Sequence, residues 1–183
     1  MTRTLVVVDV QNDFCEGGSM GVDGGSTVAS AVAETIAADT YDVVVATKDH
    51  HIDPGDHFSD SPDFVDSWPP HCVVGTVGEA FHDPIEESLF AEVFRKGEYD
   101  AAYSGFEGTS DDGTNLASWL RAHGVTAFDV CGIATDYCVR ATALDGAREG
   151  FDVTVLRSLT AAVSAANLPK VEDEFKAANV DLR

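Results

Sequence analysis

Basic side chains are scarce in this chain of 183 residues. It has 11 Lys and Arg residues against 32 Asp and Glu residues, which gives a formal net charge of -21. A surface this acidic repels nucleic acids and anionic membranes, so we expect neither as a partner. Charge repulsion of this size also weakens a compact fold at low salt, and we interpret the composition as halophilic, suited to a salt-rich cytoplasm. The alternative interpretation is an ordinary acidic enzyme.

Long apolar segments are lacking as well. No run of residues has the length of a transmembrane helix, and residues 1–14 do not resemble a signal peptide, so we expect a cytoplasmic protein. The length and the hydrophobic content of 44% suit one domain, which we assign to residues 1–183. Nothing indicates secretion, so we expect the four cysteines to be reduced thiols. The sequence leaves open whether the chain forms a homo-oligomer.

Short apolar segments alternate with amphipathic ones along the chain. Strands are predicted at 5–8, 42–46, 91–94, 126–131 and 153–156, and helices at 27–38, 115–123, 137–150 and 171–178. The alternation predicts an α/β fold with three layers, a parallel sheet with helices on both faces. Ligands of such sheets bind beyond the carboxyl ends of the strands. Four reactive side chains follow successive strands and should meet at this edge: Asp9, Asp49, Lys96 and Cys138.

Cys138 follows the fourth predicted strand and a break at Gly132. Thr135 and Asp136 are good N-cap residues, so we expect Cys138 in the first turn of a helix. Free N–H groups and the helix dipole would lower the pKa of the thiol there, and the same N–H groups can stabilise an oxyanion. The alternative is a small buried cysteine, which is our interpretation of Cys131.

Asp9 and Lys96 strengthen the case for a nucleophilic cysteine. Asp9 ends an apolar strand, where a carboxylate is costly unless it is paired, and it can act as a general acid and base. Lys96 is one of four lysines and can stabilise both a thiolate and the carboxylate. The alternatives are a loop-capping aspartate and a surface lysine.

Residues 49–71 form a long irregular segment rich in proline and histidine. Asp49, His51, His57 and His71 suit a divalent metal such as zinc, iron(II) or manganese. His50 competes with His51, but in an extended segment Asp49 and His51 share one face and His50 points away. The alternative is a set of solvated loop histidines.

Aromatic residues lie in or beside the loops near the same edge. Singly, each is an ordinary packing residue, but together they can form the wall of a pocket for a small flat ring. These residues are Phe14, Trp68, Tyr103 and Tyr137.

Several motifs resemble one known family. They are residues 8–14 (VDVQNDF), 47–58 (TKDHHIDPGDHF), 68–72 (WPPHC), 94–97 (FRKG), 103–106 (YSGF) and 131–139 (CGIATDYCV). The chain is similar over nearly its whole length to the nicotinamidases, also called pyrazinamidases, of the isochorismatase-like cysteine hydrolases. The metal motif is the specific part, because many relatives in the superfamily lack it.

The resemblance implies a Rossmann-like hydrolase fold and a catalytic triad of Asp9, Lys96 and Cys138. It also implies the metal ligands named above and a cis peptide before Ala134, which would direct the N–H groups of Ala134 and Cys138 at the oxyanion. Ile133 would join the aromatic residues in substrate binding. The implied reaction, through a thioester on Cys138, converts nicotinamide to nicotinate and ammonia in NAD salvage, and extends to pyrazinamide.

One departure concerns specificity. Tyr137 stands where many nicotinamidases have histidine, which leaves the fine specificity of the pocket open. Two rival functions are hydrolysis of another small amide or carbamoyl group, and a catalytically silent metal-binding or sensor protein. The intact triad argues against the silent protein.

Overall fold

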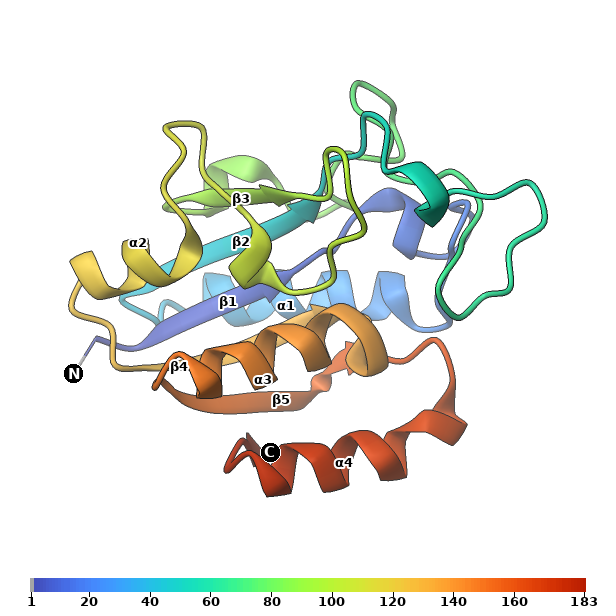
Figure 1. Ribbon diagram of the computed structural model, residues 1–183. Helices are drawn as coiled ribbons and strands as arrows, with labels where there is room; N and C mark the ends of the chain where they lie inside the picture. Colours follow the sequence, from blue (N-terminus) through green and yellow to red (C-terminus); the bar gives the residue numbers. More distant parts are fainter. Residues whose placement is uncertain (1) are drawn as a thin grey trace.

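The computed structural model describes residues 2–183 and contains a six-stranded sheet in which all neighbouring strands are parallel. The strand order is β3-β2-β1-β4-β5-β6 (Figure 1). The strands are β1 Thr4–Val8, β2 Val43–Asp49, β3 Val93–Lys96, β4 Ala127–Ile133, β5 Asp152–Ala161 and β6 Asp181–Leu182. The main helices are α1 Gly25–Ala37, α2 Leu116–Ala122, α3 Arg140–Arg148 and α4 Leu168–Ala177. The predicted α/β fold with a parallel sheet is confirmed.

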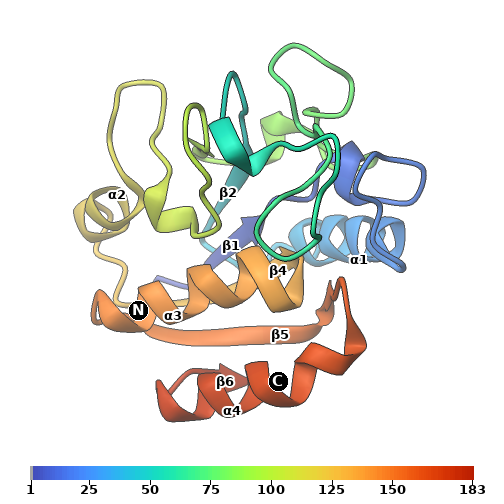
Figure 2. The ribbon, with the colours of Figure 1, turned by 45° about the vertical axis from the view of Figure 1, so that its right-hand side comes forward.

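Helices cover both faces of the sheet, as the sequence predicts (Figure 2). The alternation of side chains in β1 separates the two hydrophobic cores, because successive residues of a strand point to opposite faces. Leu5 and Val7 pack with α1 on one face. Val6 and Val8 belong to the core that α2, α3 and α4 cover on the other face. The sheet is thereby buried on both sides, which explains the nearly continuous apolar run of β1.

Gly132 lies inside β4, so the predicted strand end at this glycine is wrong. Gly132 has φ of 113°, and a Cβ there would lie 2.0 Å from the carbonyl oxygen of Val8, so only glycine fits. The register of β4 against β5 shifts at this point, and Gly132 pairs with Thr160. This irregular pairing extends β5 to Ala161, well past the predicted end at 156.

Other predicted boundaries were also wrong. β3 ends at Lys96 instead of Phe94, and the two-residue β6 was missed because its apolar pattern is too short to see. Helix α1 begins at Gly25, after Gly24 at φ of 87°. Its N-terminal cap comes from Glu16, whose carboxylate accepts from the Gly24 N–H at 2.7 Å and the Ser26 N–H at 2.8 Å.

None of the helices in residues 2–183 is both long enough and apolar enough to span a membrane. All four cysteines are free thiols, as expected.

Candidate active site

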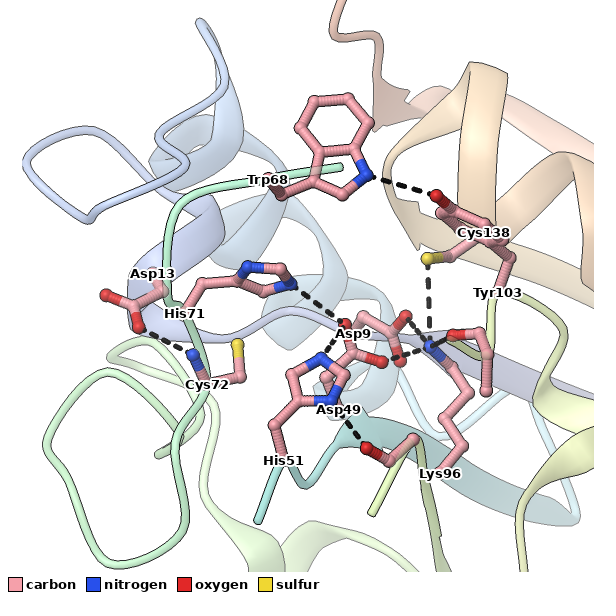
Figure 3. A network of polar contacts seen from close by, with 12 residues as sticks. Asp9, Asp13, Asp49, His51, Trp68, His71, Cys72, Lys96, Tyr103 and Cys138 are labelled. Carbon is pink, nitrogen blue, oxygen red and sulfur yellow. Dashed lines mark hydrogen bonds and ion pairs between the residues drawn. The ribbon is translucent and has the colours of Figure 1, made fainter. Parts of the chain in front are cut away.

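Three strand ends and one turn bring the reactive side chains together at the carboxyl edge of the sheet (Figure 3). Asp9 directly follows β1, and Asp49 and Lys96 are the last residues of β2 and β3, where they pair in the ladder. Cys138 lies in the turn that follows β4. The four side chains predicted from the sequence to converge therefore do so, and each is less than a tenth exposed.

Lys96 is the centre of this cluster. Its Nζ lies 2.8 Å from Asp9 Oδ2 and 3.7 Å from Cys138 Sγ, and it also forms an ion pair with Asp49 Oδ1. It donates a further hydrogen bond to the carbonyl of Ala102 at 3.1 Å. Burial alone would lower the pKa of Lys96, but the carboxylates of Asp49 and Asp9 raise it well above its usual value. The lysine is therefore charged at neutral pH.

The two carboxylates differ in their surroundings. Burial raises the pKa of Asp9, although Lys96 and the Thr47 hydroxyl, which donates to Asp9 Oδ1 at 2.6 Å, oppose the rise. Burial acts on Asp49 in the same direction, but Lys96 and the contacts with His51 and His71 hold the pKa of Asp49 well below its usual value. Asp9 is thus the carboxylate that can take and return a proton, while Asp49 keeps its negative charge.

The environment of Cys138 corrects the sequence-based expectation. Thr135–Val139 form a single π-helical turn, and α3 begins only at Arg140. Neither Thr135 nor Asp136 caps a helix with its side chain. Burial raises the pKa of the Cys138 thiol well above its usual value, and the lowering effect of Lys96 does not overcome it. The predicted low pKa of the thiol was wrong, because a buried sulfur beside two carboxylates loses more from desolvation than it gains from one cation.

Asp136 has a structural task instead. Its carboxylate accepts hydrogen bonds from the Val163 N–H at 2.9 Å, the Ser164 N–H at 3.0 Å and the Asn167 side chain at 2.9 Å. These bonds tie the connection between β5 and α4 to the turn that holds Cys138. They keep Val163 at the cavity described below.

The peptide bond between Ile133 and Ala134 is cis. Ala134 and Cys138 both line one cavity, as does Ile133. Ala134 and Cys138, whose N–H groups are predicted to contact the oxyanion, therefore lie in the wall of the same cavity as the Cys138 thiol.

Three histidines form a buried cluster next to the triad. His51, His57 and His71 each offer a ring nitrogen, and these atoms lie within 4.8 Å of one another. His51 Nδ1 contacts the carbonyl of Gly97 at 2.6 Å and His71 Nδ1 contacts that of Pro69 at 2.8 Å, so each Nδ1 carries the proton and leaves Nε2 as a lone-pair donor. Among residues 2–183, His51 Nε2 and His57 Nδ1 are buried without a hydrogen-bond partner. Buried imidazole nitrogens with no partner fit a divalent metal ion.

Asp49 joins the triad to this cluster. Its Oδ2 lies 3.5 Å from His51 Nε2 and 3.8 Å from His71 Nε2, while its Oδ1 contacts Lys96. Burial and the neighbouring imidazoles lower the pKa of His57 to about 4, so this ring is neutral near pH 7. A neutral His57 ring and an ionised Asp49 carboxylate are in the protonation states that a metal site requires. His50 instead contacts Glu79 through Nδ1, outside the cluster.

The cavity beside Cys138 is mostly apolar. Trp68 donates from Nε1 to the Tyr103 hydroxyl at 3.0 Å, and its ring lies edge-on to Tyr137 with centroids 5.2 Å apart. The rings of Phe14 and His71 pack together with their centroids 5.4 Å apart. All five residues predicted to bind substrate line this cavity: Phe14, Trp68, Tyr103, Ile133 and Tyr137.

Sequence reasoning missed four other lining residues. They are Met20, Val22, Ala102 and Val163. All four lie in loops, where no periodic pattern indicates which side chains turn inward. The glycines around positions 20 and 22 did indicate a loop at this edge.

The Isochorismatase domain family matches residues 3–178. Nicotinamidase/pyrazinamidase of Mycobacterium tuberculosis is 55% identical over 181 residues, 98% of this chain and 97% of that protein. A solved pyrazinamidase of Pyrococcus horikoshii in complex with zinc is 35% identical, with a TM-score of 0.82 over 100% of this chain and 99% of that one. A protein from L. infantum in complex with nicotinate is also 35% identical, with a TM-score of 0.85, covering 100% of this chain and 92% of that one.

Proposed function

The chain belongs to the isochorismatase family, and we propose that it is a nicotinamidase that hydrolyses nicotinamide to nicotinate and ammonia in NAD salvage. Pyrazinamide, a related aromatic amide, is the second substrate. The observation that carries the proposal is the contact of Lys96 with both Asp9 and Cys138 at a cavity that is also lined by His57 and His71, two of the three buried histidines. The family expected from the sequence motifs is confirmed.

The protonated thiol and the paired carboxylate define the first step. Asp9 accepts the proton of Cys138 while Lys96 stays beside both groups and balances the charge. The sulfur forms a bond with the amide carbon, and the carbonyl electron pair moves to the oxygen. The N–H groups of Ala134 and Cys138 stabilise this oxyanion.

Collapse of the tetrahedral species completes the acylation. Asp9 gives its proton to the amide nitrogen, the C–N bond breaks, ammonia leaves and a thioester remains on Cys138. Asp9 then takes a proton from a water molecule, whose oxygen attacks the thioester carbon. The thiolate leaves and recovers the proton from Asp9, which restores the enzyme. The product leaves as nicotinic acid, which loses its proton to solvent and becomes nicotinate.

The histidine cluster has a separate task in substrate binding. His51, His57 and His71 with Asp49 would hold one divalent ion, zinc, iron or manganese, which when bound supplies a Lewis acid for a pyridine nitrogen. The rings of Trp68 and Phe14 hold the flat substrate in the cavity and exclude water from it.

Several finer expectations belong to the same proposal. Residues 1–183 form one cytoplasmic domain that acts on a small molecule and binds neither nucleic acid nor membrane. The net charge of -21 supports the halophilic interpretation, because molar salt screens repulsion within such a surface. Tyr137, whose ring contacts Trp68 edge-on, determines which small aromatic amides the enzyme accepts as substrates.

The test is release of ammonia from nicotinamide by the metal-loaded chain, before and after alkylation with iodoacetamide. We expect turnover that alkylation abolishes, with Cys138→Ala as the inactive control and metal analysis run in parallel. Turnover of other small amides in place of nicotinamide and pyrazinamide would favour the rival hydrolase. Bound metal without any turnover would indicate the silent binding protein.

A further inference from the structure

Gln11 is completely buried, and it contacts the backbone of Asp49, the residue that joins the catalytic triad to the histidine cluster. Its Nε2 donates to the carbonyl of Asp49 at 2.9 Å and to that of Glu79 at 2.8 Å. Its Oε1 accepts from the N–H of Asp49 at 2.8 Å. One amide thus binds both backbone groups of Asp49 and one carbonyl of the segment after His71.

The place of Gln11 in the fold explains why a side chain is needed there. The ladder between β1 and β2 ends at Val8 and Thr47, and Asp9 then turns away with φ of 49°. Asp49 lies two residues beyond this end and, on its other side, still pairs with Lys96 of β3. Because β1 no longer supplies a backbone partner, the N–H and C=O of Asp49 that face β1 would be unpaired and buried. The amide of Gln11 replaces the missing peptide group.

The position of Asp49 matters to both parts of the site. Its Oδ1 contacts Lys96, which contacts Asp9 and Cys138. Its Oδ2 faces the Nε2 atoms of His51 and His71 at 3.5 and 3.8 Å. A shift of the Asp49 backbone would therefore displace the catalytic ammonium and the metal-facing oxygen together.

We propose that Gln11 is the positioning residue that holds Asp49 where its carboxylate serves Lys96 and the histidine cluster at the same time. This inference rests on the proposed function, since it assigns Gln11 a task within that site. Gln11 itself touches neither the substrate nor the reacting atoms. It acts through the backbone of Asp49.

The test replaces Gln11 by Met, which keeps the length of the side chain and removes all three hydrogen bonds. We expect the dissociation constant for zinc, measured by competition with a chelator, to rise about 10–100-fold, as for other residues that orient metal ligands. At saturating zinc, kcat for nicotinamide should fall about tenfold or more while KM changes less, because Lys96 loses its fixed partner. Gln11→Glu, which keeps only the acceptor for the Asp49 N–H, should be impaired in the same two measurements.

Asn12→Ala is the matched control. The Asn12 amide donates at 2.8 Å to the carbonyl of Val77, in the same segment that Gln11 contacts, but it does not contact Asp49. Its zinc affinity and kcat should stay at the wild-type values.

Three outcomes would overturn the proposal. Gln11 variants with a lower Tm but wild-type zinc affinity and kcat would show a purely structural role. Equal losses in Asn12→Ala would assign the effect to the segment around Val77. Failure of both Gln11 variants to fold would place the role of this residue in the fold. Wild-type chain that releases no ammonia would refute the proposed function instead, and the comparison of zinc affinities would still decide the role of Gln11.

Discussion

Replacing Thr47 by Val removes a hydroxyl that donates to the proposed general base. Thr47 Oγ1 lies 2.6 Å from Asp9 Oδ1, and both residues are completely buried. Valine has nearly the same shape, so the change removes a hydrogen bond and leaves the packing in place. A hydrogen bond to a buried charged group contributes about 1.5–3 kcal/mol, and one to a neutral group about 0.5–1.5 kcal/mol. The cost of Thr47→Val should therefore depend on whether Asp9 is ionised.

Proton binding determines how the stability difference between Thr47→Val and wild type changes with pH. Burial already raises the pKa of Asp9 in the folded state, and the Thr47 hydroxyl opposes that rise. Its removal raises the folded-state pKa further, so the native variant binds more protons than the native wild type at intermediate pH. The free energy of unfolding of the variant must then fall relative to wild type as pH increases. We expect a loss of about 1.5–3 kcal/mol near neutral pH, or about 3–12 °C in Tm, and a smaller loss in acid.

Urea unfolding at several pH values measures this difference, and the pH dependence of kcat/KM for nicotinamide provides a second reading. The acidic limb of the kcat/KM profile should move to higher pH in Thr47→Val, because a smaller fraction of Asp9 is then ionised at a given pH. Thr47→Ser is the control, since it keeps the hydroxyl and loses only a methyl group. Its loss of stability should not vary with pH. A stability difference for Thr47→Val that is the same at all pH values, with an unmoved acidic limb, would refute the assignment of Asp9.

Three other predictions concern the thiol, the metal ligands and the acidic composition. Cys138→Ala should abolish turnover of nicotinamide without a large change in Tm, and substantial activity in the folded variant would exclude a cysteine mechanism. Metal analysis should find about one ion per chain in the wild type. His51→Ala and His71→Ala should each lose that ion, whereas His50→Ala should keep it; the reverse pattern would show that the ligand choice is wrong. Thermal stability should rise from low to molar potassium chloride, because the Debye length shrinks to about 3 Å at 1 M, and a Tm independent of salt would remove the halophilic interpretation.

The residues at the strand ends could be predicted from the sequence, because reactive polar side chains directly follow apolar strand segments. Asp9 directly follows four consecutive apolar residues, and a carboxylate there needs a partner. In a parallel sheet all carboxyl ends lie on one edge, so Asp49 and Lys96 had to be near it. The direction of His50 away from His51 followed from the alternation of side chains in extended backbone, and the contact of His50 with Glu79 agrees with it.

Features that depend on distant partners could not be predicted in this way. The N-terminal cap of α1 comes from Glu16, nine residues before the helix, because its carboxylate accepts hydrogen bonds from the N–H groups of Gly24 and Ser26. The extension of β5 depends on a register shift at Gly132. Gln11 lies within the motif at residues 8–14, but nothing in the sequence indicates its bond to Asp49, which is 38 positions away. Such contacts depend on how segments far apart in the sequence are placed in the fold.

The pKa of Cys138 is the point at which local reasoning about the sequence failed, and it leads to a last prediction. A helix start favours a thiolate, but Cys138 is only 7% exposed, and its Sγ lies 3.7 Å from an ammonium that is already shared by Asp9 and Asp49. The thiol should therefore carry its proton in the resting enzyme and lose it to Asp9 only when substrate is bound.

Alkylation of Cys138 by iodoacetamide requires the thiolate, so its rate should increase about tenfold per pH unit and show no plateau below pH 8, where a thiol of low pKa would already be fully ionised. Mass spectrometry assigns the modified residue, with Cys138→Ala as the control. The rate should be proportional to the iodoacetamide concentration at every pH, which shows that opening of the buried site does not limit the reaction. A plateau below pH 8 would show that the resting sulfur is a thiolate, and the transfer of its proton to Asp9 would then have to precede substrate binding.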